Sequence, residues 1–353
     1  MQKSFKEIVK KSKLIVYIYE MFFKIKNRIF YVIKLKTSKK YHEAKPRKVC
    51  WGGENPDKTF YVLRNDISDW GIYTIGVCFL HQLEWIEKKG YIPVVDLSSP
   101  NLISLDGERT NANKWDYYFE PMVNGYSLES IRKSKNVILG WNNNSIYWMM
   151  DSVIGLSDSS QVKPWVDRFG NNFNKYFRLN KDIWNAVKGF YDKAMKNKRI
   201  IGVSIRDEYR CRYLLHQKQI DKHNLMLTPE EYAQKTELLM KEWKCDYVYV
   251  MSDDEEALGV FKEIFGETLI FFPRQRIEFF KNGIPNREIV DRPEKFHSLH
   301  KNLVSNYLVE TELLAMCTGL YSGISSSTQM ALLRNNGKYE KIQLEYHGKY
   351  AVK

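Results

Sequence analysis

The chain has 353 residues, of which 44% are hydrophobic, and a formal net charge of +13. This length and apolar content are enough for two α/β domains of about 150 residues each. Its five cysteines are scattered without a C-x-x-C pair, which indicates reduced thiols in a cytosol and argues against a disulfide framework or a zinc site. The sequence lacks G-x-x-x-x-G-K-[ST] and G-x-G-x-x-G, which argues against P-loop kinases and typical NAD-binding folds.

The first 48 residues form a basic arm. Residues 1–50 hold fifteen Lys or Arg against three Glu, a net charge of +12. Apolar side chains recur at helical spacing from Leu14 to Val32, but charges interrupt them within ten residues, which is too short for a membrane span. No small-residue cleavage site follows, so the arm is a poor signal peptide. A basic amphipathic helix fits an anionic membrane surface; a nucleic-acid arm and a helix packed on the protein's own core are the alternatives.

Residues 49–195 are predicted to form an N-terminal α/β domain. We expect strands at Thr59–Arg64, Ile92–Leu97 and Asn136–Leu139, a helix at Gly71–Lys88, a packed aromatic segment at Trp115–Glu120 and a linking helix at 180–197. The loop after the first strand should face a cleft, with Trp70 and Gly71 close to a ligand. Trp70 suits the core equally well. Residues 141–178 are rich in Asn, Ser and Trp and receive no assigned role.

Residues 196–353 are predicted to form a second, Rossmann-like domain. Three strands are expected, and each ends in a polar loop: Ile200–Ile205 before Arg206-Asp207-Glu208, Asp246–Met251 before Ser252-Asp253-Asp254, and Leu320–Ile324 before Ser325-Ser326-Ser327-Thr328. Ligands of open α/β sheets bind beyond the carboxyl ends of the strands. A guanidinium forks onto phosphate oxygens, and hydroxyls and free amides at a helix start suit the same anion. The pattern predicts a nucleotide-diphosphate pocket; the alternative is solvated polar loops whose ion pairs contribute little.

A long loop follows the first of these strands. Residues 206–227 lack a periodic pattern, and structureless loops of this length are usually functional or disordered. The next helix is well signalled, because Thr228 as N-cap, Pro229 at the first helical position and Glu231 form a capping box. The segment before Thr228 is therefore a genuine loop.

Several segments resemble the fucosyltransferase superfamily, which includes the α1,6-fucosyltransferases, NodZ and the protein O-fucosyltransferases. They include IGVSIRDEYR, DYVYVMSDDEE and VETELLAMCTGLYSGISSSTQMALL, with NPDKTFYVLRND and NNGKYEKIQLEYHGKY near the two ends. The resemblance covers roughly residues 54–350 and is nearest to bacterial members of polysaccharide gene clusters. It implies a GT-B-like α/β fold, in which two Rossmann-like domains face across a cleft. Residues 49–195 would then form the acceptor side and residues 196–353 would bind the donor.

The resemblance also implies roles for the strand-end residues. Arg206 matches the arginine that contacts the donor phosphates and the departing oxygen. Asp253 and Asp254 match an acidic pair near the nucleotide. Ser325 and Ser326 match hydroxyls placed against the β-phosphate, and the helix start that they share with Ser327 and Thr328 would help to stabilise the departing diphosphate.

Glu310 matches an acid that holds the guanine base. A carboxylate can accept hydrogen bonds from the guanine ring N–H and its amine, and the alternative is an acid on a helix surface. The chain departs from the family at Ser204, where a histidine is usual, and at Tyr209, where an aspartate is usual. Ser204 in place of the histidine leaves the identity of the donor sugar nucleotide open. Asp207 or Glu208 would take over the role of the missing aspartate, or would only pair with Arg210 and Arg212. One of these two carboxylates would also take the proton of the acceptor.

The expected activity is an inverting transfer of fucose from GDP-fucose to a hydroxyl of a bacterial surface glycan. No cofactor and no metal are expected, since positive groups would neutralise the leaving diphosphate. The expected partners are the nucleotide sugar, a glycan acceptor, with a lipid-linked glycan as one candidate, and an anionic membrane surface. No nucleic acid is expected as a partner. The enzyme would lie in the cytoplasm, peripheral at the inner face of the cell membrane. Use of another nucleotide sugar, or binding of nucleotide or glycan without catalysis, are the rival functions.

Overall fold

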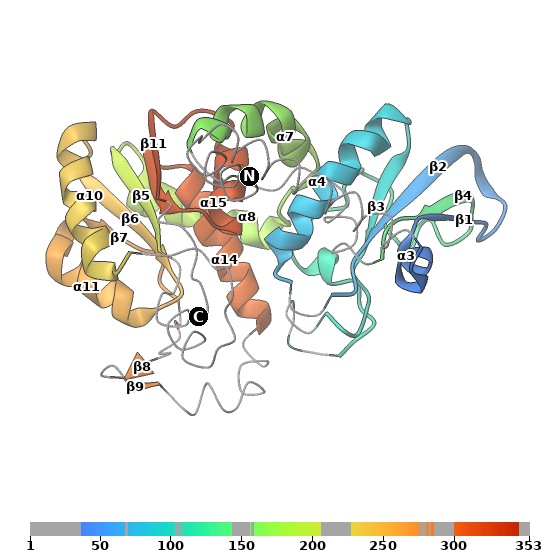
Figure 1. Ribbon diagram of the computed structural model, residues 1–353, viewed down its shortest axis with the longest axis horizontal. Coiled ribbons are helices and arrows are strands. Elements are labelled where there is room, and N and C mark those ends of the chain that lie inside the picture. Colours follow the sequence, from blue (N-terminus) through green and yellow to red (C-terminus); the bar gives the residue numbers. More distant parts are fainter. Residues whose placement is uncertain are drawn as a thin grey trace, which may run out of the picture.

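The described part of the chain is a mixed α/β fold with two main sheets, which lie on opposite sides of Figure 1. The computed structural model describes residues 37–67, 70–102, 105, 107, 109–142, 156, 159–205, 227–274, 276, 280–281, 284–285 and 300–345. The apolar stretch of the predicted arm and the long loop at 206–226 lie outside these residues.

The first sheet is built from residues near the N-terminal end of this region. Its elements are α3 (Lys39–Ala44), β1 (Arg47–Val49), β2 (Glu54–Arg64), α4 (Ile72–Lys88), β3 (Ile92–Asp96), the 3-10 helix η1 (Lys114–Tyr117) and β4 (Ser134–Leu139). The strand order is β1-β4-β2-β3. β2 runs parallel to β3 and β4, and β1 runs antiparallel to β4. The three strands and the helix predicted here are confirmed, with ends shifted by up to five residues.

Alternate residues of β2 enter two separate cores, as the two-residue period of a strand requires. Tyr61 and Leu63 belong to the large core that includes α4. Phe60 and Val62 belong to a smaller core on the other face, which also contains Leu128. The first sheet is therefore covered on both faces.

The second sheet is entirely parallel. Its elements are α8 (Lys181–Phe190) with the π-helical turn η3 (Tyr191–Met195), β5 (Ile200–Ile205), α10 (Pro229–Trp243), β6 (Tyr247–Ser252), α11 (Glu255–Phe265), the 3-10 helix η4 (Gly266–Thr268), β7 (Leu269–Ile270), α14 (His300–Ala315), β10 (Gly319–Gly323), α15 (Ser326–Asn335) and β11 (Lys341–Glu345). The order β11-β10-β5-β6-β7 reverses direction between β5 and β10, as in doubly wound folds. A separate short hairpin pairs β8 (Phe280–Lys281) with β9 (Ile284–Pro285).

Helices cover both faces of the second sheet. α10 and α11 pack on one face, where Tyr232 and Phe261 are fully buried. α14 covers the other face and approaches so closely that a Cβ at Gly202 would lie 2.7 Å from Leu314 Cδ1. The predicted capping box of α10 is confirmed, since Thr228 and Glu231 each accept from the other's amide.

A helix that the sequence analysis did not assign lies between the two sheets. α7 (Val162–Tyr176), preceded by the 3-10 helix η2 (Ser159–Gln161), packs against both α4 and α15. Arg334 of α15 reinforces this junction: its guanidinium contacts Glu312 at 2.7 Å and Asn174 Oδ1 at 3.0 Å. The large core runs from Tyr61 through α7 to α14, so apolar packing joins the two halves.

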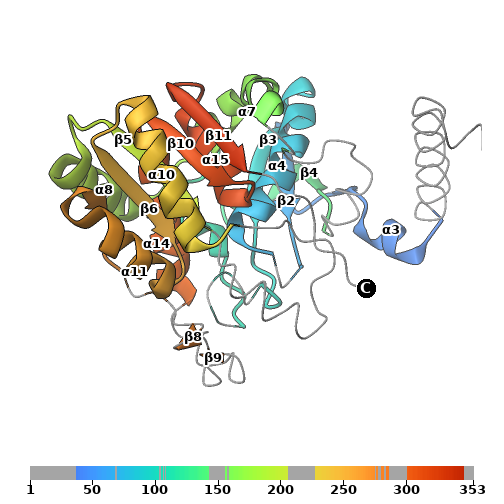
Figure 2. The same cartoon turned by 60° about the vertical axis from the view of Figure 1, so that its left-hand side comes forward.

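Three further observations concern membrane spans, the position of α3 and the cysteines. No helix in the described ranges is long and apolar enough to cross a membrane. α3 lies on the outer side of the first sheet, away from α10 and α11 (Figure 2). None of the cysteines that the structure describes, Cys50, Cys78, Cys245 and Cys317, forms a disulfide with another described residue.

Candidate functional site

The carboxyl ends of β5 and β10 lie side by side where the strand order reverses. Ser204 on β5 pairs with Ser322 on β10, and the Ser322 hydroxyl lies 3.2 Å from the Ser204 carbonyl oxygen. The crevice outside this reversal is where doubly wound sheets bind ligands. The structure thus places the predicted residue Ser204, which is 6% exposed, at the floor of the switch point.

The loop after β10 is organised by its own hydroxyls. Ser325 is the N-cap of α15 and accepts from the Thr328 amide at 3.2 Å. The Thr328 hydroxyl donates to the Gly323 carbonyl at 2.7 Å, and this side chain is fully buried. Ser327 is also buried, with its hydroxyl 2.8 Å from that of Ser325. Ser327 and Thr328 therefore stabilise the turn, while Ser325 and Ser326 stay partly exposed and are the hydroxyls that a ligand can reach.

The N-terminus of α4 meets the N-terminus of α15 at this point. The hydroxyl of Thr74, in the first turn of α4, lies 3.2 Å from the hydroxyl of Ser326. Gly71 is the exposed N-cap of α4, and Trp70 is half-buried against the large core. Trp70 thus has the core contact that the sequence left open, beside the predicted site. Each helix start carries partial positive charge and free amides, so two that converge form a setting suited to an anion.

Four charged side chains form a network at the end of β6. Arg274 contacts Glu310 at 2.7 Å and Asp253 at 2.8 Å. Arg276 contacts the other Glu310 oxygen at 2.9 Å and donates to the Ser252 carbonyl at 3.1 Å. The Glu310 side chain and both guanidiniums are at most 2% exposed, whereas Asp253 is 53% exposed. The structure therefore joins the predicted residues Asp253 and Glu310 through an arginine that lies between them.

The surroundings of Glu310 contradict one of the two interpretations of the sequence and constrain the other. The interpretation of Glu310 as an acid on a helix surface is wrong, because its side chain is fully buried. Burial raises the pKa of Glu310, and the guanidiniums of Arg274 and Arg276 oppose that rise. Burial also lowers the pKa of Arg274, but Glu310 and Asp253 outweigh it and raise that pKa. Because both Glu310 oxygens accept from guanidiniums, a base that approaches Glu310 competes with these bonds. A guanine contact stays a prediction.

Asp254 is buried at the N-terminus of α11. Its carboxylate accepts from the Glu256 amide at 3.0 Å and is the N-cap of that helix. Burial raises the pKa of Asp254 to about 6, although the Glu256 amide opposes the shift. The observed role of Asp254 is helix capping, and its contact with a nucleotide stays a prediction.

The first sheet presents its own charged groups where β2 and β3 end. Arg64 donates from Nη2 to the Gly140 carbonyl at 2.6 Å and so ties the end of β2 to the end of β4. Asp96 accepts from the Ser98 amide at 3.0 Å. Burial raises the pKa of Asp66, which follows Arg64 in the loop that leads to α4. The loop therefore carries a partly exposed carboxylate on the same segment as the α4 N-terminus.

The predicted catalytic residues Arg206, Asp207 and Glu208 lie outside the described residues. They follow directly on Ile205, the last residue of β5, so their chain segment begins between the β10 and β6 ends. No group of three or more potential metal ligands occurs in the part of the chain that the structure describes. The absence of a metal requirement stays a prediction.

Three side chains at these strand ends were not identified from the sequence: Thr74, Arg274 and Arg276. Thr74 lacks a local signal, because its partner Ser326 is 252 positions away. Arg274 and Arg276 carried one signal, since they follow β7 in the segment Phe-Pro-Arg-Gln-Arg. Arginines after a strand of a parallel sheet belong on a list of site candidates.

No protein-family model matches the chain, and no curated protein matches its sequence. Solved structures with a similar fold include NodZ α1,6-fucosyltransferase soaked with GDP-fucose, with 13% identity, a TM-score of 0.45, and coverage of 78% of this chain and 92% of that chain. POFUT1 in complex with GDP has 9% identity, a TM-score of 0.44 and coverage of 82% and 99%. A variant of Arabidopsis thaliana FUT1 with GDP has 13% identity, a TM-score of 0.39 and coverage of 87% and 77%. At these values the similarities concern the fold, and the function is argued from the site.

Proposed function

We propose that this chain is a glycosyltransferase that holds the diphosphate of a nucleotide sugar at the switch point of the second sheet. One observation carries the proposal: the hydroxyl of Ser326, at the start of α15, lies 3.2 Å from the hydroxyl of Thr74, at the start of α4, so the two helix N-termini converge. Helix N-termini bind phosphates through free amides and the helix dipole. Doubly wound α/β folds bind nucleotides at the reversal of strand order, which supports the proposal.

The proposed reaction is an inverting transfer of fucose from GDP-fucose, as the sequence resemblance implies. The acceptor oxygen bonds to the anomeric carbon, and the bond from that carbon to the β-phosphate oxygen breaks. GDP departs with the electron pair and with added negative charge. Arg206 and the start of α15 would stabilise that charge, which is commonly the largest contribution in such chemistry.

A carboxylate would take the proton of the acceptor hydroxyl. Asp207 and Glu208 are the candidates beside Arg206 in the sequence. Asp66 is a further candidate, because it lies on the loop that leads to α4 and burial raises its pKa. A raised carboxyl pKa brings the group closer to the proton affinity that a general base needs near neutral pH.

The proposed acceptor is a hydroxyl of a bacterial surface glycan, bound between the two halves of the molecule. The donor half would be residues 196–353 and the acceptor half residues 49–195. The arm at residues 1–48 would hold the enzyme at the inner face of the cell membrane, beside a lipid-linked acceptor. This part of the proposal rests on the charge and spacing of the arm, with a net charge of +12 in residues 1–50.

Removal of residues 1–36 tests the arm, because it leaves α3 and the paired strand β1 in place. The shortened chain should leave anionic vesicles while retaining activity on a soluble acceptor, because each Lys or Arg near such a surface contributes about 1 kcal/mol. Unfolding of the shortened chain would assign the arm to the core. Unchanged sedimentation with vesicles would place the membrane contact elsewhere.

A transferase for a different nucleotide sugar is the second candidate. It is favoured by Ser204 at the usual histidine position and by Glu310, both of whose oxygens already accept from arginines. Turnover across a panel of nucleotide sugars separates the two candidates. Release of GDP from GDP-fucose alone supports the first, and turnover of another sugar nucleotide supports the second. Binding without turnover of any donor would contradict both.

A further inference from the structure

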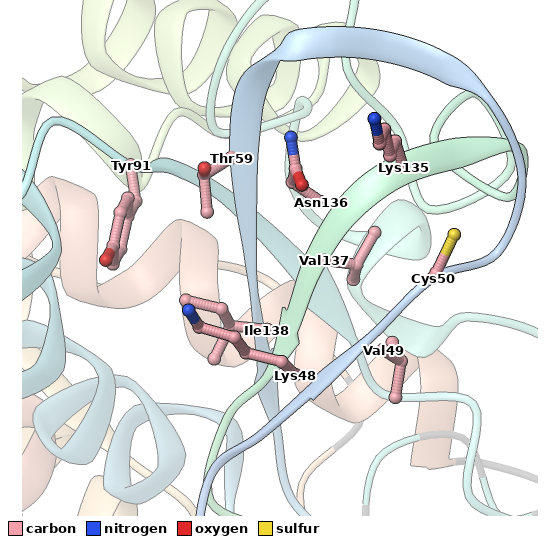
Figure 3. A pocket seen from close by; sticks show the side chains of 9 residues that line it. All are labelled: Lys48, Val49, Cys50, Thr59, Tyr91, Lys135, Asn136, Val137 and Ile138. Atoms are coloured by element: carbon pink, nitrogen blue, oxygen red, sulfur yellow. The ribbon is translucent and has the colours of Figure 1, made fainter.

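A pocket of about 460 Å³ lies on the first sheet, distant from the strand ends described above (Figure 3). It is lined by Lys48, Val49, Cys50, Thr59, Tyr91, Lys135, Asn136, Val137 and Ile138. Thr59 and Asn136 pair near the starts of the parallel strands, and Tyr91 directly precedes β3. Thr59 is five residues from Arg64 at the other end of β2, roughly 16 Å along an extended strand. The pocket is therefore separate from the proposed donor site.

The lining is positively charged and contains no carboxylate. Lys48 and Lys135 are both exposed, and neither forms an ion pair with a described residue. Thr59, Tyr91 and Asn136 supply a hydroxyl, a phenol and an amide to the same lining. Figure 3 shows the Lys48 ammonium and the Tyr91 hydroxyl on the same side of β2. Unpaired ammonium groups with neutral hydrogen-bonding groups fit a phosphate ester, whereas a second cation would be repelled.

An aromatic rim adjoins these cations. The ring of Tyr91 lies 5.6 Å from that of Trp85 on α4, and Trp85 is 44% exposed. Tryptophan and tyrosine side chains have an apolar body and a polar end, and both are enriched where protein meets the lipid headgroup region. A soluble anion would not require this exposed indole.

The basic character continues along the same edge of the molecule. β1 follows α3 directly, and these elements carry the exposed side chains Lys39, Lys40, Lys45 and Arg47. The predicted basic arm, residues 1–48, includes α3 and the start of β1, and its apolar stretch precedes α3 in the chain. α3, β1 and the pocket thus form one basic edge, which is where the arm enters the fold.

We propose that the pocket in the β1–β4 region binds the phosphate-ester headgroup of an anionic lipid. The inference builds on the membrane contact of the proposed function and adds a defined headgroup site within the folded part. Lys48 would contact the phosphate oxygens, and Lys135, on the other side of β4, would add positive charge to the same edge. Trp85 and Tyr91 would rest at the headgroup level. The strand carboxyl ends at the opposite end of β2 would remain open to donor and acceptor.

Vesicle sedimentation of the full chain tests this site without any need for turnover. The probe is a mixed phosphatidylcholine and phosphatidylglycerol vesicle at fixed ionic strength. Lys48→Gln combined with Lys135→Gln should weaken binding about 25-fold, given about fivefold for each lysine near an anionic surface. The matched control, Lys193→Gln with Lys241→Gln, removes the same charge from exposed positions on other elements and should change binding less than twofold.

A second pair of variants separates the pocket from general attraction. Thr59→Phe fills the pocket without a change of charge, and Thr59→Leu is a smaller change should the first variant fail to fold. Either folded variant should weaken vesicle binding severalfold, and soluble glycerol phosphate should compete with vesicles for the wild type only. Normal binding by the filled variants, or equal losses in the two lysine pairs, would overturn the site.

Two further results identify the source of the phosphate or separate this site from the proposed activity. Competition by glucose 1-phosphate together with no vesicle binding would assign the phosphate to a glycan and overturn the lipid assignment. Vesicle binding that depends on Lys48 and Lys135, in a protein that turns over no donor, would support the pocket while contradicting the proposed transferase activity.

Discussion

The carboxyl ends of β10 and β6 belong to one sheet but carry different polar groups. At the end of β10, the polar groups are neutral hydroxyls and the start of α15, and Ser325 and Ser326 remain partly exposed. At the end of β6, two arginines and two carboxylates contact one another, and Glu310 is fully buried between guanidiniums. The end of β10 can therefore accept an anion, whereas the arginines at the end of β6 are already paired with carboxylates.

The comparison shows that the density of charged side chains is a poor guide to a binding site. A phosphate at the β6 end would compete with carboxylates for Arg274 and Arg276. A phosphate at the β10 end meets free amides and hydroxyls. β5 lies between β10 and β6. β10 and β6 are therefore two strand spacings, or about 10 Å, apart. Arg206 directly follows β5 in the sequence, and its placement lies outside the described residues.

The largest expected effect concerns the stability of the β6 network. Glu310→Ala should lower the free energy of unfolding by about 3–5 kcal/mol, because it leaves two buried guanidiniums without their carboxylate. Denaturant unfolding measures this loss. The control is Glu255→Ala, which removes an exposed ion pair with Lys262 and should cost at most about 1 kcal/mol. Equal losses in the two variants would show that the β6 network is not structural.

The same position also tests recognition of the base. The milder variant Glu310→Gln keeps an acceptor for one arginine, and its GDP and UDP affinities can be compared below its unfolding temperature. A greater loss for GDP would show that Glu310 contacts guanine as well as arginine. Equal losses would assign it to structure alone.

The next effect concerns the charge that the β10 region lacks. Arg206→Ala should reduce transfer about 100-fold or more, as does the removal of a group that stabilises charge in the transition state. Arg206→Lys should fail almost as badly, because a point charge does not replace a two-pronged guanidinium. Steady-state kinetics, with thermal unfolding as a check of the fold, measure both. Near-normal activity of the lysine variant would contradict the assignment.

An intermediate effect is expected in the pH dependence of stability at Asp254. Its folded pKa, about 6, is raised above its ordinary value of 3.8, so the folded state holds this proton more tightly than the unfolded state. The resulting stabilisation is complete below pH ~4 and is lost as pH rises through about 6. Asp254→Asn keeps a capping residue and should gain on the order of 2 kcal/mol relative to wild type between pH ~4 and ~7. A difference between variant and wild type that is constant across this range would refute the shift.

The smallest effect concerns the exposed hydroxyls. Ser326→Ala should weaken GDP binding by about 1 kcal/mol, the usual size for one hydrogen bond, and calorimetry can measure it. Thr74→Val should have a similar effect, because its hydroxyl shares the site at 3.2 Å. Ser130→Ala, exposed in the first half, serves as the control. No loss in either site variant would leave the helix amides as the sole phosphate contacts.

The sequence predicted those elements whose signals are local. β5, α4 and the capping box of α10 agree with the structure because alternation, length and capping residues act over a few positions. α7 was missed although Trp165, Phe169 and Phe173 recur at helical spacing. Its N-cap, Gln161, makes no capping side-chain hydrogen bond, and the surrounding Asn, Ser and Trp residues resemble a loop in composition.

The site was predictable only to the level of strand ends. Ser325 and Ser326 were identified because a parallel sheet gathers its carboxyl ends at one edge. The sequence could not predict which of the four hydroxyl residues are buried in the turn and which stay partly exposed, because this depends on how the turn folds. The saturation of Glu310 by Arg274 and Arg276 arises from contacts 36 and 34 positions apart, for which a single sequence has no pattern.

A crystal structure of the protein with bound GDP tests the central claim most directly. The account predicts that the diphosphate lies at the start of α15, with a β-phosphate oxygen within hydrogen-bond distance of Ser325 or Ser326 and near Thr74. The Arg274–Glu310 contact should remain intact in the same crystal. A diphosphate bound to Arg274 and Arg276, with the switch point of the second sheet free of nucleotide, would contradict the account.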